Sequence, residues 1–263
     1  MKDCILNYYE EYKKFMCLEK DILPAINPVE LSAEDTENVY AYVDVDNVKK
    51  SVVDVYYRSD LSNKKIIFQK SKLFHEFTHI LDAVTIFANY QGKEFRLLMH
   101  TYSEYNASQI ELACGIGMKS IKALLQIDLR YIKAYNNENA VNIESDYICH
   151  LADAAVIINQ SLDDYCNLTE YEYYSKYKNF ETKTMYYLGK KNFCSMISSV
   201  KIADITSKTY GDFYPFIYEI EQAIIKKDFD RLISAREKLW QKYYVTFPFR
   251  NLGKLLIELM KLQ

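Results

Sequence analysis

The spacing of apolar side chains predicts a helix at the start of this chain and a small β-sheet after it. Between residues 4 and 20, apolar side chains recur every three or four positions, and a loop with two prolines follows. From Val39 to Val45 and from Val52 to Tyr57, apolar residues alternate with polar or aromatic ones, which is typical of strands. The run Ile66–Phe68 is β-branched and aromatic, and it predicts a third strand.

A helical period begins after this third strand. Ser71 is a candidate N-cap for that helix. Its apolar face is formed by residues three and four positions apart, namely Leu73, Phe77, Ile80, Val84 and Phe87. His75, His79 and Asp82 fall on a different face. We therefore expect the two histidines to serve chemistry and not to fill the core.

Helical patterns continue to the end of the chain. Asn89–Gly92 predicts a stop, and a second helix is expected from about residue 93 to residue 115. Its predicted core positions are Leu97, Leu98, Ala107, Ile110 and Cys114. Further candidate helices cover residues 118–134, 143–160, 168–190, 212–226, 228–244 and 248–262.

These elements predict a predominantly helical α+β protein with a small sheet. The polar run Tyr135–Asn139 is the expected boundary between a core over residues 1–134 and a helical region over residues 135–263. The two parts are either separate or one continuous domain. We expect the helical region to shape access to a substrate and to supply no metal ligand.

Residues 75–79 read His-Glu-Phe-Thr-His, which is an HExxH motif. Residues four apart on a helix lie one turn apart on the same face, so the imidazoles of His75 and His79 can reach one metal ion. Glu76 stands beside them, where its carboxylate can take a proton from an attacking water. A catalytic Zn²⁺ needs three protein ligands and an open position, so a third ligand is expected downstream.

Glu104 is the favoured third ligand. It follows His79 by 25 residues, which is enough chain for a helix end, a turn and a return. Glu111 would share its helix face, while His100 and Asp82 lie within a turn of Glu104 and His79 respectively, so all three remain alternatives. Asp82 also suits the role of hydrogen-bond acceptor for a ligand imidazole.

Three further residues near these ligands have possible roles. His100, Tyr102 or Tyr105 can hydrogen-bond an oxyanion, although a histidine without a role is the commoner outcome for His100. His150, much later in the chain, is expected to face helix packing.

The order of strand, HExxH helix, turn and Glu-x-x-Ala helix resembles the ImmA/IrrE family of small bacterial and phage metallopeptidases. The resemblance covers roughly residues 38–118. It implies a zincin-like core of the gluzincin type, with Zn²⁺ bound by His75, His79 and Glu104 and with Glu76 as the catalytic residue. It also implies a regulatory protein substrate, such as a transcription repressor of a mobile element or a stress response.

The chain departs from that family at three positions. Thr78 stands where the family often has glycine, and Asn106 and Ser108 interrupt its usual Glu-Ala-Asn run. These departures concern family membership more than metal binding, because none of the proposed ligands is replaced.

Composition narrows the class of protein further. The chain is 49% hydrophobic and contains only 6 Gly and 4 Pro in 263 residues, which favours long helices over an all-β fold. Its six cysteines form no Cys-x-x-Cys pair, and the sequence contains neither a signal-peptide pattern nor a stretch of 18 apolar residues. We expect a cytoplasmic protein that does not enter a membrane.

Charge is unevenly distributed around a net value of −3. Residues 1–63 carry 7 basic and 13 acidic side chains, a balance of −6, whereas residues 226–263 carry 9 and 4, a balance of +5. A solvated helix face explains the basic end better than a nucleic-acid partner does. The tyrosine-rich stretch Tyr171–Tyr187 has balanced charge and is expected to pack in the core.

Together these patterns predict a zinc-dependent metallopeptidase that hydrolyses a protein or peptide substrate. The alternative is a non-catalytic protein- or nucleic-acid-binding module with a structural or vestigial metal site. The coordination of the metal discriminates between them, because a structural site is closed by four protein ligands.

Overall fold

The computed structural model describes residues 1–19, 22–32, 39–122, 143–160, 163–166, 168–198 and 206–247. Its first elements are α1 (Lys2–Phe15), β1 (Ala25–Leu31), β2 (Ala41–Val43), β3 (Val52–Arg58), η1 (Ser59–Asn63), α2 (Ile66–Val84), α3 (Gly92–Leu98), η2 (Met99–Ser103) and α4 (Glu104–Gly115). They are followed by α5 (Ile143–Ile158), α6 (Asp163–Cys166), α7 (Glu170–Ile197), α8 (Thr206–Tyr210), η4 (Gly211–Phe213), α9 (Tyr214–Lys226) and α10 (Phe229–Thr246). The predicted class, α+β and mostly helical, is confirmed.

The sheet has three strands in the order β1-β3-β2, with β1 parallel and β2 antiparallel to β3. β2 and β3 confirm the two predicted strands. β1 lies where the sequence predicted a loop, and Pro28 within it pairs opposite Val55. Proline lacks an N–H donor, but an edge strand such as β1 tolerates this because one side of its backbone has no partner strand.

The predicted strand at Ile66–Phe68 is wrong, because these residues form the first turn of α2. The helix begins after Lys65, and Ser71 lies inside it with its Oγ donating to the carbonyl of Phe68 at 2.9 Å. The side-chain amide of Gln69 instead donates to the backbone carbonyl of Lys64 at 2.7 Å and stabilises the start of the helix. A short β-branched run has only a weak strand preference, and tertiary packing overrides it here.

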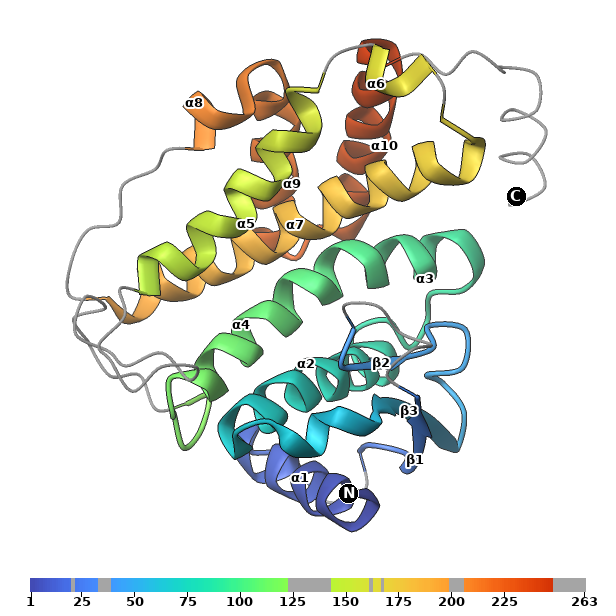
Figure 1. Ribbon diagram of the computed structural model, residues 1–263, viewed down its shortest axis with the longest axis vertical. Helices are drawn as coiled ribbons and strands as arrows, with labels where there is room; N and C mark the ends of the chain where they lie inside the picture. Colours follow the sequence, from blue (N-terminus) through green and yellow to red (C-terminus); the bar gives the residue numbers. More distant parts are fainter. Residues whose placement is uncertain are drawn as a thin grey trace.

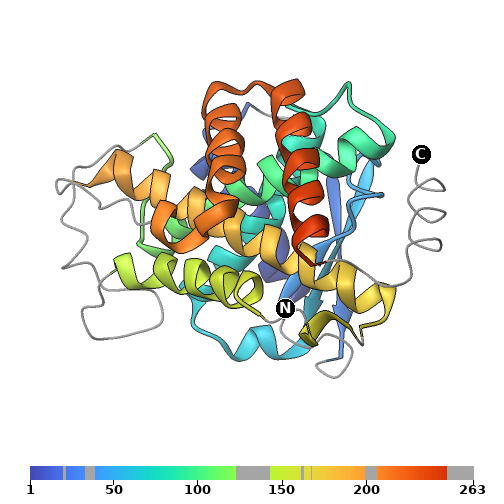
Figure 2. The same ribbon diagram turned by 90° about the horizontal axis from the view of Figure 1, so that it is seen from above.

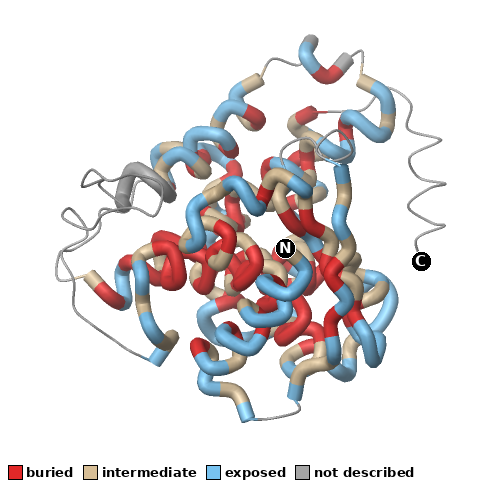
Figure 3. Tube along the Cα trace, turned by 60° about the horizontal axis from the view of Figure 1, so that its bottom comes forward, coloured by how far each residue is buried: buried red, intermediate tan, exposed pale blue. Residues whose placement is uncertain are grey.

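α2 is the central helix of the molecule. It packs against α1 and β2 on one side and against α4 on the other, and α4 in turn packs against α7 (Figure 1). α5 lies along α7, and α9 and α10 form a hairpin beside them (Figure 2). Buried residues gather where these layers meet (Figure 3). The predicted polar face of α2 is therefore covered, and His75, His79 and Asp82 are all buried.

The second predicted helix is confirmed as a continuous helical segment with a π-helical turn inside it. α3 passes through the π-helical segment η2 into α4, and all five predicted core residues are buried. π-Helical turns are uncommon and occur frequently at functional sites. This one immediately precedes Glu104.

Most of the later helices are also observed. The candidates at residues 143–160, 168–190, 212–226 and 228–244 correspond to α5, α7, η4 with α9, and α10. Residues 118–122 are not helical, and the rest of the candidate at 118–134 lies outside the described residues. The candidate at 248–262 and the predicted boundary at 135–139 also lie outside them.

The predicted core packing of the tyrosine-rich stretch is confirmed in part, since Tyr173, Tyr177 and Tyr187 on α7 are buried but Tyr171 and Tyr174 are exposed. Their aromatic partners include Trp240 and Tyr243 on α10. Within the described ranges, no helix is both long enough and apolar enough to cross a bilayer.

Candidate metal centre

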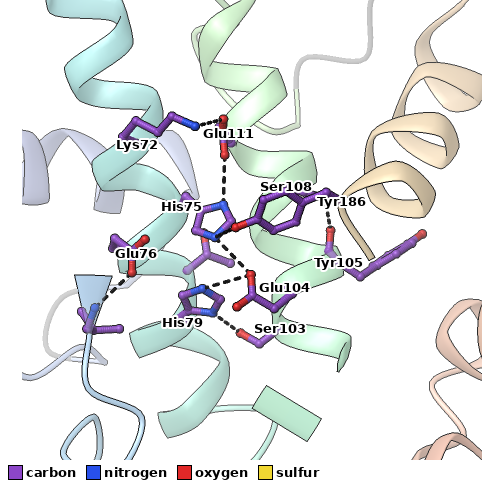
Figure 4. Close-up of polar contacts among 12 residues, drawn as sticks. Lys72, His75, Glu76, His79, Ser103, Glu104, Tyr105, Ser108, Glu111 and Tyr186 are labelled. Atoms are coloured by element: carbon purple, nitrogen blue, oxygen red, sulfur yellow. Dashed lines mark hydrogen bonds and ion pairs between the residues drawn. The ribbon is translucent and has the colours of Figure 1, made fainter. Parts of the chain in front are cut away.

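Three side chains from two helices converge in the buried space between α2 and α4. His75 and His79 extend from successive turns of α2, and Glu104 faces them from the first turn of α4 (Figure 4). Glu104 Oε2 lies 3.3 Å from Nε2 of His75 and 3.7 Å from Nε2 of His79. The three potential ligand atoms all lie within 4.8 Å of one another. The structure thus brings together the three residues that the sequence predicted as metal ligands.

This donor set fits a tetrahedral zinc ion. With Zn–N and Zn–O distances of about 2.0–2.1 Å, neighbouring ligand atoms in a tetrahedral site are about 3.3 Å apart. The distances of 3.3 and 3.7 Å to Glu104 Oε2 are close to that value. Glu104 Oε2 is also a buried oxygen that makes no hydrogen bond of good geometry. A buried acceptor of this kind is costly unless a cation or a donor satisfies it.

The orientation of His79 is set by hydrogen bonds on the opposite side of its ring. Its Nδ1 lies 2.8 Å from Oγ of Ser103, and this hydroxyl donates to Oδ2 of Asp82 at 2.8 Å. Asn106 donates to the other oxygen of Asp82 at 2.9 Å. Because the Ser103 hydroxyl uses its proton in the hydrogen bond to Asp82, its oxygen must accept a hydrogen bond from Nδ1–H of His79. Nε2 of His79 is then unprotonated, with its lone pair directed toward Glu104.

His75 is oriented by a carboxylate instead. Its Nδ1 lies 3.1 Å from Oε2 of Glu111, whose other oxygen accepts from Lys72 at 2.7 Å. Glu111 therefore contacts the nitrogen of His75 that points away from Glu104. Nδ1 makes no hydrogen bond of good geometry, so the carboxylate acts on the ring through its charge, which favours a proton on Nδ1 and raises the basicity of Nε2. Glu111 was an alternative third ligand from the sequence, and the geometry places it behind His75 instead.

Glu76 lies on the side of α2 that faces the sheet. Its Oε2 accepts from the backbone amide of Val43 in β2 at 3.1 Å (Figure 4). The amide of Val43 therefore points toward α2 and not toward β3. Because β2 is an edge strand in the order β1-β3-β2, its site-facing backbone groups are not paired with another strand of this sheet.

Burial and neighbouring charge shift the pKa of each group in the centre. Burial disfavours the imidazolium, but the close carboxylates of Glu104 and Glu111 outweigh it and raise the pKa of His75 to about 10. Burial lowers the pKa of His79 to about 4. Although burial favours the neutral acid, the two imidazoles lower the pKa of Glu104 to about 2. Burial raises the pKa of Glu76 to about 8.

These shifts describe a centre built around positive charge. Without a metal, His75 carries the positive charge between two ionised carboxylates. A divalent cation among the same three ligand atoms would displace that proton and neutralise the carboxylates more fully.

The other sequence candidates lie outside the group of three ligand atoms. His100 Nε2 lies 3.4 Å from Nζ of Lys178 on α7. Tyr102 is buried in an aromatic cluster with Phe87, and the hydroxyl of Tyr105 accepts from Asn192 at 3.2 Å. Asp82 reaches the centre only through Ser103. The predicted helix-packing place of His150 is confirmed in part, since its ring contacts a tyrosine of α7.

That tyrosine, Tyr186, is one of three residues described at this centre that the sequence interpretation missed, the others being Ser103 and Lys72. The Tyr186 hydroxyl lies 3.4 Å from Nε2 of His75, the nitrogen that faces Glu104. Tyr186 follows His75 by 111 residues and belongs to a tyrosine-rich helix, so no spacing rule distinguishes it from its neighbours. The sequence predicted a helix here, but it did not indicate which of the tyrosines on that helix would face the histidines.

We found no match to this chain among protein-family models, curated proteins or solved structures. The resemblance to the ImmA/IrrE family therefore stays an interpretation of two motifs. Function has to be argued from the centre itself.

Proposed function

We propose that this protein is a zinc-dependent metallopeptidase. The observation that carries the proposal is the convergence of His75, His79 and Glu104 on one small volume, with the HExxH glutamate Glu76 beside it. Two imidazoles and one carboxylate form a donor set of the kind that zinc hydrolases use, and such a site keeps a position for substrate. Zn²⁺, when bound there, supplies a Lewis acid that polarises a scissile carbonyl and lowers the pKa of water.

The protein's own groups then have distinct tasks. Glu76 takes a proton from the attacking water and returns it to the leaving amine. It is the glutamate of the HExxH motif, and its carboxylate is held by a backbone amide, whereas that of Glu111 is paired with His75 and Lys72. Ser103 with Asp82, and Glu111 with Lys72, hold the two imidazoles in the tautomers that leave Nε2 available.

We further propose that the substrate is a protein segment in extended conformation. The edge strand β2 runs beside Glu76, and an edge strand binds an extended peptide through backbone hydrogen bonds. By the resemblance of residues 38–118 to ImmA/IrrE proteins, a transcription repressor is the first candidate substrate. The alternative function remains a binding module with a structural or vestigial metal site.

The test separates catalysis from metal binding. Glu76→Gln should retain the fold and about one zinc per chain but lose nearly all cleavage, because an amide cannot accept the proton. The protein would be produced in bacterial cells, and new protein N-termini would be identified by mass spectrometry and compared with those in cells producing the wild type. Zinc content would be measured on the purified proteins by elemental analysis.

Glu94→Gln on α3 is the matched control, since Glu94 is exposed and should leave both cleavage and zinc unchanged. Identical sets of new N-termini in wild-type and Glu76→Gln cells, with zinc bound to both proteins, would favour the binding module. A wild-type protein that holds no stoichiometric zinc after reconstitution would exclude the metal centre altogether.

A further inference from the structure

We propose that Tyr186 of α7 is a further catalytic residue of this centre, whose hydroxyl donates a hydrogen bond to the oxygen that gains negative charge when a carbonyl is attacked. This inference rests on the proposed function. Its starting observation is that the Tyr186 hydroxyl lies 3.4 Å from Nε2 of His75, while Glu104 Oε2 lies 3.3 Å from the same nitrogen. The hydroxyl therefore points at the space on which the ligand atoms converge (Figure 4).

The Tyr186 ring is held in this orientation by two histidines. Its centroid lies 5.4 Å from that of His75, with the ring planes at 77°. It also lies 5.4 Å from the centroid of His150 on α5, at 82°. Edge-to-face contacts with both histidines restrict rotation of the ring. His150 is then a positioning residue, and it acts only through Tyr186.

The backbone of α7 is held close to α4 one turn further on. A Cβ atom on Gly189 would lie 2.1 Å from Oγ of Ser108 and 2.3 Å from the carbonyl oxygen of Tyr105. Only glycine allows two helices to approach this closely at that point. Because Gly189 follows Tyr186 by three residues, the close contact lies on the same side of α7 and sets the distance of Tyr186 from Glu104.

The side of the centre opposite Tyr186 carries the proposed base. Glu76 and the edge strand β2 lie across the ligands from α7, so the base and the hydroxyl donor approach from opposite sides (Figure 4). A neutral hydroxyl placed before the reaction stabilises developing negative charge more than it stabilises a neutral carbonyl. Removing one such donor is expected to lower kcat by about 100-fold with little change in KM.

The experiment uses the full chain loaded with Co²⁺, whose visible absorption reports its ligands, and inorganic phosphate as a tetrahedral oxyanion probe. Tyr186→Phe should bind Co²⁺ with the same affinity and the same spectrum as the wild type. It should bind phosphate about 10-fold more weakly, because one hydrogen bond to a charged group is lost. Tyr171→Phe is the control, since Tyr171 is on the same helix but 81% exposed.

The outcomes distinguish this inference from the function on which it rests. A wild-type protein that fails to bind Co²⁺ overturns both. If the wild type binds Co²⁺ but Tyr186→Phe has unchanged phosphate affinity, or if phosphate binds neither protein, the role of Tyr186 is wrong and the metal centre stands. Weaker Co²⁺ binding and an altered spectrum in Tyr186→Phe would make Tyr186 a fourth ligand, which also overturns the inference and favours a closed, structural site.

Discussion

At the residue scale, the two histidines of the motif differ in what stands behind them. His79 Nδ1 contacts Ser103, whose hydroxyl donates a hydrogen bond to the buried Asp82, whereas His75 Nδ1 contacts the carboxylate of Glu111. The neutral hydroxyl of Ser103 thus separates the His79 ring from the carboxyl group of Asp82, whereas the ionised carboxylate of Glu111 contacts the His75 ring directly. Glu104 and Glu111, both candidates from sequence, therefore act on opposite nitrogens of His75 and have separable roles.

This separation predicts different metal affinities for two similar variants. Glu104→Ala removes a proposed ligand and should weaken zinc binding by more than about 100-fold. Glu111→Gln removes only the negative charge beside Nδ1 of His75. Loss of a residue that contacts a ligand but not the metal typically lowers metal affinity by about 10- to 100-fold. Competition with a chromophoric chelator measures both affinities, with Glu94→Gln as the exposed control. Full zinc affinity in Glu104→Ala together with loss in Glu111→Gln would move the third ligand to Glu111.

At the element scale, the centre depends on the approach of α7 to α4. The missing side chain of Gly189 allows the contact with Ser108 and Tyr105, and the amide of Asn192 adds a hydrogen bond to the Tyr105 hydroxyl at 3.2 Å. The π-helical segment η2 leads directly into this same end of α4, where it places Ser103 against His79 and Glu104 against both imidazoles of the motif. Two local backbone features thus align three helices.

Gly189→Ala tests this alignment. In an exposed helix, alanine in place of glycine stabilises by about 1 kcal/mol, so any loss of stability reports the collision with Ser108 and Tyr105. We expect a net destabilisation of about 1–3 kcal/mol, measured by urea denaturation, because one contact is a backbone carbonyl that cannot rotate away.

Zinc should still bind to Gly189→Ala, since the ligands belong to α2 and α4, while the phosphate affinity of the Co²⁺ protein should decrease as Tyr186 moves away. Ser175→Ala, at an exposed position of α7, is the control and should change stability by less than about 0.5 kcal/mol. A Gly189→Ala protein as stable as the wild type would show that the helices adjust without cost.

At the scale of the whole molecule, the parts before and after residue 135 share one continuous core. Buried residues of α2, α4, α5, α7, α9 and α10 belong to a single cluster. Besides the contact of α7 with α4, Phe229 at the start of α10 packs against Phe87 and Tyr102, with ring centroids 5.3 and 5.2 Å apart. The later helices therefore cover the outer side of the helices that hold the centre.

A chain ending at residue 134 should for this reason be insoluble or lack cooperative unfolding, because it would expose Phe87, Tyr102 and the α7-facing side of α4 to water. Separate expression of residues 1–134, with solubility, thermal unfolding and zinc content as readouts, tests this expectation. A soluble fragment that unfolds cooperatively and binds one zinc would instead make the predicted boundary at Tyr135–Asn139 a true domain boundary.

The sequence alone determined the features that depend on spacing along the chain. A turn of helix places His75 and His79 together whatever surrounds them, and the periods of two and of 3.6 indicated β2, β3 and the longer helices. Short segments were less certain, because a run such as Ile66–Phe68 is compatible with a strand or a helix. Pro28 argued against a strand in general, and only the position of β1 at the sheet edge makes it acceptable.

Tertiary structure decided everything that depends on which helices meet. Whether Glu104 or Glu111 faces Nε2 of His75 follows from how α4 lies on α2, since both residues share a helix face one heptad apart. Tyr186 joins the centre only because α7 crosses α4 at Gly189. Periodicity indicates which side of a helix is buried, but the partner against which it packs is set by long-range contacts that local spacing does not encode.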